Sequence, residues 1–184
     1  MNALYTAAKQ ISDFMIARNW EFAIIGGMAV QRWGEPRQTL DVDLTLLTGF
    51  GGEDEYIATL LGSFGSRIAD AADFAARNRV LLLAAENGAP IDVSLGGLPF
   101  EKRVIQRASP FIFAPECELV TCSAEDLIVL KAFAGRPRDW LDVESIVNRQ
   151  DSIDWGTVLR EIRPLAEAKD APETVSRLET LAAQ

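Results

Sequence analysis

Apolar residues recur along the chain in two periods, one typical of helices and one of strands. Residues 3–18 carry apolar side chains at helical spacing, and shorter apolar runs at 21–25, 41–47, 79–83, 91–95 and 118–121 are typical of strands. Further helices are predicted near 28–33, 53–64, 70–77 and 99–107. This mixed order predicts an α/β (α+β) fold, with a mixed sheet flanked by helices.

The turn pair Asn87-Gly88 lies between two of these apolar runs. Asn-Gly between strand-like segments is a strong hairpin signal, so 79–83 and 91–95 are expected to pair. That hairpin would place Asp92 on a central strand, beside the strand that begins with Asp41 and Asp43.

Asp41 and Asp43 are two residues apart on a predicted strand, so their side chains should project from the same face. Mg²⁺ in phosphoryl-transfer sites takes oxygen ligands, usually one or two carboxylates together with water and phosphate oxygens. Asp41, Asp43 and Asp92 each have a simpler interpretation as solvated acids. Together they sit among apolar residues, where unpaired charge is costly, and this favours a shared metal site.

Gly26 and Gly27 follow the predicted strand 21–25 and precede the predicted helix 28–33. Glycine lets the backbone approach a ligand closely, and the first N–H groups of a helix favour an anion such as a triphosphate. An ordinary turn is the alternative. The glycine-rich segment 49–52 lacks the Lys-Ser/Thr of a P-loop and is interpreted as a connector.

Arg37 and Thr39 precede Asp41 at alternating positions, so all could share one face if that strand begins early. Arg37 would then contact phosphate, since a guanidinium makes bidentate bonds to phosphate oxygens. An exposed loop arginine is the equally weighted alternative.

Ser123 to Asp126 forms a capping-box pattern that predicts a helix from about Ala124. The expected buried stripe comprises Leu127, Leu130, Phe133 and Ala134, widened by Ile128 and Val129. Lys131 is the only charge between Leu127 and Ala134. Its amine could reach nucleotide phosphates or a catalytic acid, or it could extend to solvent as lysines commonly do.

A second helix is predicted to begin near Asp139, with Asp139 and Asp142 on one face of its first turn. For Asp142 we favour compensation of the helix dipole, and for Asp139 the role stays open. The tail from Asp154 is helical in pattern, with interruptions expected at Pro164 and Pro172.

At 184 residues and 48% hydrophobic content, the chain can bury a proper core. We expect a core over residues 1–122 and a helical C-terminal extension packed on it over 123–184, or one single domain. The lack of a signal-like terminus and of an apolar run of about 18 residues predicts a soluble, cytoplasmic protein with no membrane partner. Cys117 and Cys122 suit two reduced thiols.

The chain contains no histidine, which excludes histidine general bases and H-x-x-H metal sites. Its formal charge is −9 and its pI near 4.6, which argue against an extended nucleic-acid duplex as partner. A small nucleotide is easier to reconcile with this charge, and an RNA substrate would be contacted at one end.

Three stretches carry a family resemblance: IIGGMAVQRWGEPRQTLDVDLTL, APIDVSLGG and SAEDLIVLKAFAGRPRDWLDVESIV. They resemble the DNA polymerase β-type nucleotidyltransferase superfamily, and more narrowly its AbiEii/AbiGii toxin-like branch. The resemblance implies that Asp41, Asp43 and Asp92 are catalytic metal ligands and that Gly26 and Gly27 form the phosphate-side turn. It further implies that Lys131, with Asp139 or Asp142, belongs to the later motifs of the branch.

The expected activity is therefore transfer of a nucleoside monophosphate from an NTP to an RNA end, a protein or a small molecule, using Mg²⁺ or Mn²⁺. The branch also suggests a toxin-like component of a toxin–antitoxin or phage-defence system, with a cognate antitoxin as a partner. An antibiotic-modifying nucleotidyltransferase is the first alternative. A non-catalytic nucleotide-binding or partner-binding module is the second, which the presence of all three acids argues against.

Overall fold

The computed structural model describes residues 2–183, which form seven strands and nine helices. The strands are β1 Phe22–Ile24, β2 Val42–Leu47, β3 Gly65–Ser66, β4 Val80–Ala84, β5 Pro90–Gly96, β6 Ser109–Ala114 and β7 Cys117–Thr121. The helices are α1 Ala3–Ile16, α2 Gly26–Trp33, α3 Glu53–Leu61, α4 Ala71–Asn78, α5 Pro99–Arg107, α6 Ala124–Ala134, α7 Pro137–Arg149, α8 Trp155–Ala168 and α9 Pro172–Ala182.

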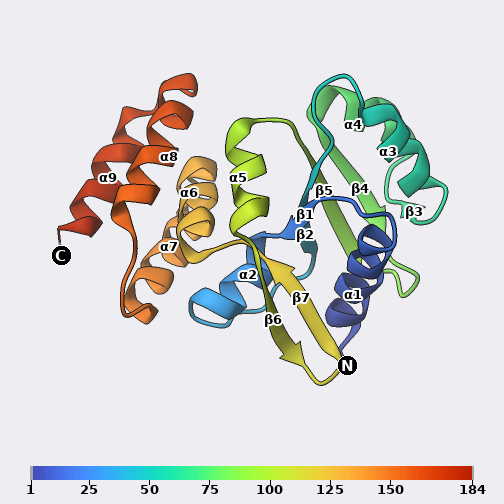
Figure 1. Cartoon of the computed structure of the whole chain (residues 1–184), viewed down its shortest axis with the longest axis horizontal. Coiled ribbons are helices and arrows are strands. Elements are labelled where there is room, and N and C mark those ends of the chain that lie inside the picture. The colour runs from blue at the N-terminus through green and yellow to red at the C-terminus, as the bar shows by residue number, and fades with distance from the viewer. Residues whose placement is uncertain (1, 184) are drawn as a thin grey trace. The chain divides into compact units, whose positions relative to one another are not determined.

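The seven strands form one mixed sheet in the order β3-β4-β5-β2-β1-β7-β6 (Figure 1). β2 runs parallel to β5 and β1 runs parallel to β7, whereas the remaining neighbours are antiparallel. The predicted hairpin is confirmed, because β4 pairs antiparallel with β5 across the Asn87-Gly88 turn. The predicted α/β class with a mixed sheet is confirmed as well.

The alternation of side chains along β2 and β5 separates a core face from a polar face. Val42, Leu44 and Leu46 on β2 are fully buried, and they belong to the same core cluster as the apolar residues of β5 and of α1. Burying each such aliphatic side chain stabilises the fold by roughly 1.5–3 kcal/mol. Since successive side chains point to opposite faces, this packing directs Asp43 and Asp92 away from the core.

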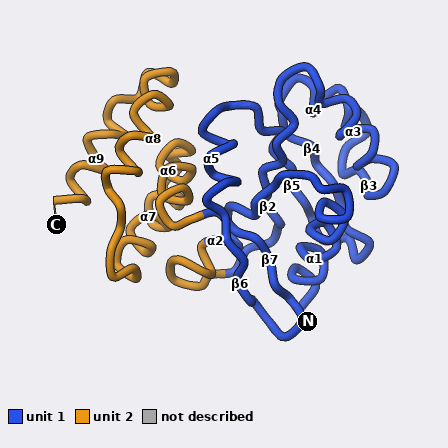
Figure 2. The backbone as a smooth tube through the Cα atoms, viewed as in Figure 1, with its two compact units in different colours: residues 1–29, 38–122 blue, residues 30–37, 123–184 orange. Residues whose placement is uncertain are grey.

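The described chain divides into two compact units (Figure 2). Unit 1 comprises residues 1–29 and 38–122, and unit 2 comprises residues 30–37 and 123–184. Within unit 2, α6 packs against α7 and α8, and α8 packs against α9. The division into domains at residues 122 and 123 stays a prediction. Across residues 2–183, no helix is long and apolar enough to span a membrane.

The helical tail differs from the expectation at Pro164. Proline removes a backbone donor and crowds the preceding turn, which is why a break was expected. Instead, α8 continues through Pro164, with Val158 and Ile162 buried before it and Ala166 buried after it. Packing of one continuous apolar face outweighs the local cost of the proline. Pro172 does begin a new helix, a position that suits proline.

The sequence pattern did not predict the strands β3 and β6, and it assigned the buried face of α6 incorrectly. β3 is only two residues long, and β6 contains Pro110, which an edge strand tolerates. In α6, Phe133 is 39% exposed and Ala134 is exposed as well, so including them in the buried stripe was wrong. The buried positions near them are Val129 and Ala132.

Candidate functional site

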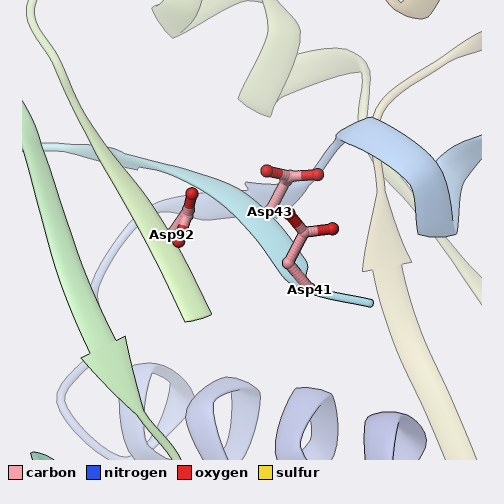
Figure 3. Close-up of side chains that lie close together, drawn as sticks. All are labelled: Asp41, Asp43 and Asp92. Carbon is pink, nitrogen blue, oxygen red and sulfur yellow. The ribbon is translucent and has the colours of Figure 1, made fainter. Parts of the chain in front are cut away.

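Asp41, Asp43 and Asp92 meet at the polar face of the sheet in unit 1 (Figure 3). Asp43 on β2 stands directly opposite Asp92 on the parallel strand β5, and Asp41 lies just before β2. One carboxylate oxygen from each residue lies within 4.8 Å of the other two, and all three side chains are half-buried. We call these three residues the carboxylate site.

Gly26 and Gly27 let the start of α2 approach the carboxylate site. Gly26 has φ +61°, and a Cβ there would lie 2.0 Å from the Asp43 Oδ2 atom. A Cβ at Gly27 would lie 2.4 Å from the Thr39 Oγ1 atom. Any larger residue at either position would therefore displace the side chain beside it. The backbone of the pair therefore lies close to Asp43 and Thr39, while its predicted approach to a phosphate stays a prediction.

Pairing of β1 with β2 fixes this arrangement, because the Ile25 N–H donates to the carbonyl oxygen of Asp43 at 2.9 Å. The first N–H groups of a helix have no partner inside the helix, so the start of α2 provides donors beside the three acids. Thr39 adds a local contact, since its hydroxyl donates to Asp41 Oδ1 at 3.0 Å. Thr39 precedes β2 and lies outside any strand.

Arg67 forms an ion pair with Asp92 Oδ1, a contact that the sequence did not predict. Arg67 follows β3, and the short length of that strand left no periodicity from which its position could be inferred. Burial raises the pKa of the Asp92 carboxyl above its ordinary value, and the charge of Asp41 raises it further, although Arg67 opposes both.

The other candidate residues lie together in unit 2, where Asp142 has two cationic partners. Arg37 Nε and Nη2 donate to its two carboxylate oxygens at 2.6 and 2.7 Å, and Lys131 Nζ lies 2.8 Å from Oδ2. Lys131 also donates to Asp139 Oδ1 at 3.3 Å. We call Arg37, Lys131, Asp139 and Asp142 the ion-pair network. The alternative interpretations, in which Lys131 and Arg37 simply extend into solvent, are therefore wrong.

Asp142 lies beyond the first turn of α7 and pairs with Arg37 and Lys131 at 3% exposure, so the expected role in compensating the dipole and capping the helix is wrong. Burial by itself would raise the pKa of Asp142, but hydrogen bonds from Arg37 and Lys131 and their charges hold it below its ordinary value. Asp139 does cap the helix, because it accepts hydrogen bonds from the backbone N–H and the side chain of Arg136.

The structure thus gathers the sequence candidates in two places. Gly26, Gly27, Thr39, Asp41, Asp43 and Asp92 come together in unit 1, and Arg37, Lys131 and Asp139 come together in unit 2. Cys117 and Cys122 are both buried free thiols, as expected.

The fold is that of the nucleotidyltransferases. An antigenic nucleotidyltransferase-like protein from Paracoccidioides brasiliensis is 17% identical, with 95% of this chain and 91% of that chain covered and a TM-score of 0.56. The lincosamide antibiotic adenylyltransferase LnuA, bound to lincomycin, is 11% identical, with 82% of this chain and 100% of that chain covered and a TM-score of 0.55. At these identities the likeness concerns the fold alone.

The family model described as nucleotidyl transferase AbiEii toxin, Type IV TA system, matches residues 19–182. The chain therefore belongs to this family and is a nucleotidyltransferase. The resemblance inferred from the three sequence stretches is confirmed. No curated protein matches the chain.

Proposed function

We propose that the protein transfers a nucleoside monophosphate from an NTP to an acceptor hydroxyl, using a divalent cation at the carboxylate site. The observation that carries this proposal is the register of β2 and β5, which holds Asp43 opposite Asp92 with Asp41 adjacent. In the reaction, a bond forms between the acceptor oxygen and the α-phosphorus, the bond to the pyrophosphate oxygen breaks, and the hydroxyl proton leaves.

The donor set fits Mg²⁺ or Mn²⁺. Three carboxylates offer hard oxygen ligands within 4.8 Å of one another, and these ions prefer oxygen. Asp41, Asp43 and Asp92 would hold the cation. When bound, the cation would neutralise charge on the phosphate oxygens and lower the pKa of a coordinated hydroxyl.

The glycine pair and the start of α2 would bind the triphosphate. Backbone N–H groups at a helix N-terminus attract phosphate, and Gly26 has no side chain to obstruct that approach. Thr39 would hold Asp41 in position through its hydroxyl. Since the chain has no histidine, the acceptor proton would pass to a carboxylate, and Asp92 is our candidate.

Direct contact of Arg37, Lys131 or Asp139 with the nucleotide stays a prediction. Their contacts within unit 2 already include mutual ion pairs, which favours a positioning role for them. Lys131→Met tests this assignment. Loss of the ion pairs should lower the melting temperature in either case; a role without phosphate contact predicts that KM for NTP stays nearly unchanged, whereas direct phosphate contact predicts that KM also rises.

Family membership supports a toxin role with a cognate antitoxin, and an RNA end is our candidate acceptor for that role. The alternative is a small hydroxylated antibiotic as acceptor. Only one observation favours it, namely the fold shared with the lincosamide adenylyltransferase, and that likeness concerns the fold alone. The acceptor classes therefore enter the test as separate arms.

The test is incubation of the protein with each α-labelled NTP, Mg²⁺ or Mn²⁺, and one acceptor pool: total RNA, protein extract, lincosamides or aminoglycosides. The variant Asp41→Asn/Asp43→Asn removes two site carboxylates. Asp54→Asn/Asp73→Asn is its matched control, because it removes the same charge from exposed residues of α3 and α4.

We expect metal-dependent label in one pool with the wild type and the control, and none with the Asp41→Asn/Asp43→Asn variant. Label in RNA would favour the toxin assignment, and label in an antibiotic would favour the alternative. The proposal is wrong if label persists in the site variant, or if no pool is labelled with any NTP or cation.

A further inference from the structure

Arg67 lies where a guanidinium can reach the carboxylate site from the edge of the sheet. Its backbone N–H donates to the carbonyl oxygen of Leu82 at 3.2 Å, and Leu82 on β4 stands opposite Asp92 on β5. The side chain therefore spans one strand to contact Asp92 Oδ1. The position of Arg67 thus follows from the backbone pairing around β4.

Arg67 occupies one of the two carboxylate oxygens of Asp92, a residue that the carboxylate site would offer to a cation. Asp41 accepts from the Thr39 hydroxyl, which brings no charge, whereas Asp92 accepts from a full positive charge. A guanidinium and a divalent cation on the same carboxylate repel each other, and each reduces the negative charge that the carboxylate offers to the other. Asp92 therefore binds the guanidinium of Arg67 and a divalent cation less tightly together than it binds either one alone.

The ion pair is also easy to displace. Both side chains are 30% exposed, and ion pairs open to water contribute little because water screens them. Arg67 belongs to no helix or strand, so its side chain can swing towards solvent without disturbing an element. Without a cation, the ion pair balances the charge of Asp92. When a cation binds, the Arg67 side chain can leave Asp92 at low cost.

We propose that Arg67 is the resident counter-ion of Asp92 and competes with the divalent cation, so that it sets the cation affinity of the carboxylate site. This inference rests on the proposed function, because it presupposes that the three carboxylates bind a cation. A supporting role for Arg67, in which it holds Asp92 in a binding geometry, predicts the opposite sign when Arg67 is removed.

The test is a titration of the metal-free full chain with Mn²⁺, following free Mn²⁺ by electron paramagnetic resonance in the absence of NTP. We expect Arg67→Gln to bind Mn²⁺ about tenfold more tightly than the wild type, because one competing charge is gone. Arg67→Lys keeps the charge and should stay within about threefold of the wild type.

Arg77→Gln is the matched control. Arg77 is exposed on α4, and its side chain donates to the carbonyl oxygen of Asp73, so the substitution removes the same charge away from any ion pair with the site. Its Mn²⁺ affinity should remain within about twofold of the wild type, since screening weakens effects between separated exposed charges.

Thermal melting provides a second readout. Without metal, Arg67→Gln should melt below the wild type, because Asp92 loses its counter-ion beside Asp41. Saturating Mn²⁺ should then raise its melting temperature more than that of the wild type, as tighter binding to the folded state requires. A variant that does not fold would show no cooperative transition, and Arg67→Met, which also removes the charge but keeps an unbranched side chain, would then take the place of Arg67→Gln in the titration.

Unchanged or weaker Mn²⁺ binding by Arg67→Gln, beside clear binding by the wild type, would overturn the role of Arg67 and leave the proposed function standing. Absence of site-dependent Mn²⁺ binding in both proteins would overturn both proposals. If Arg67→Gln binds Mn²⁺ and the wild type does not, and if adding Asp43→Asn abolishes that binding, the result would support both proposals.

Discussion

The carboxylate site and the ion-pair network both gather acids, but they balance the charge differently. Asp139 and Asp142 are at most 4% exposed, and each contacts cationic side chains of its own unit. Asp41, Asp43 and Asp92 are half-buried, and the ion pair of Asp92 is with one arginine at the edge of the sheet. The two groups therefore differ in burial, since the acids of the ion-pair network are enclosed with cations of their own unit and those of the proposed cation site remain open to water.

Energetics explain the difference. A buried carboxylate must be paired, because an unpaired charge in the interior costs several kcal/mol. In a half-buried group of three acids, water screens their mutual repulsion, and a bound cation would relieve it further. Substitution of an acid in the carboxylate site should therefore mainly change activity, whereas substitution of an acid in the ion-pair network should mainly change stability.

The largest expected effect is on activity, from Asp43→Asn. Loss of one charged ligand between Asp41 and Asp92 should lower the rate of nucleotidyl transfer by about 10³-fold or more, equivalent to about 4 kcal/mol. The melting temperature of the metal-free protein should be unchanged or slightly higher, because repulsion falls. Initial rates with labelled NTP check the first expectation, and a residual rate within tenfold of the wild type would refute it.

The next largest effect is on stability, from Asp142→Asn. Arg37 and Lys131 would lose their shared carboxylate partner, and we expect about 3 kcal/mol lower free energy of unfolding in urea. Asp13→Asn, which breaks an exposed pair with Lys9, should cost less than about 1 kcal/mol. Equal losses in the two variants would mean that burial of the network contributes nothing.

A smaller effect is expected from Gly26→Ala. The new Cβ would overlap Asp43 and the residue would be held at positive φ, so we expect roughly 2 kcal/mol of destabilisation and weakened Mn²⁺ binding. Gly88→Ala shares the positive φ but has open space, and it should cost about 1 kcal/mol with Mn²⁺ binding intact. If both variants bind Mn²⁺ normally, close approach at Gly26 is irrelevant to the site.

The stabilising effect of Asp142 should also depend on pH. The pKa of Asp142 is lower in the folded protein than in the unfolded chain, so the unfolded chain holds the proton more tightly. Its stabilising contribution is therefore complete above the unfolded pKa of about 3.9 and is lost as pH falls through the folded pKa. Urea unfolding at several pH values should give curves for the wild type and Asp142→Asn that converge in acid.

Much of the carboxylate site follows from local sequence pattern. The two-residue spacing predicted that Asp41 and Asp43 lie close together, as they do although Asp41 precedes β2, and Asn87-Gly88 predicted the hairpin that carries Asp92. The glycine pair indicated an unusually close backbone, and the structure places Gly26 close to Asp43. Each of these signals acts over a few residues, which is why sequence reasoning could recover them.

Other features depend on contacts that no local pattern encodes. Arg37 and Asp142 are separated by 105 positions, so their pairing could not be inferred from spacing. Arg67 follows a strand of two residues, too short to have a period. Pro164 stays within a helix because residues on either side are buried together.

The most direct test of the central claim is anomalous diffraction from a crystal of the protein grown with Mn²⁺ and an NTP analogue that cannot be hydrolysed. We predict an anomalous peak from a Mn²⁺ ion coordinated by Asp41, Asp43 and Asp92, with the Arg67 guanidinium withdrawn from Asp92. A crystal that contains bound nucleotide but shows no peak at these carboxylates, or a peak on other residues, would contradict it.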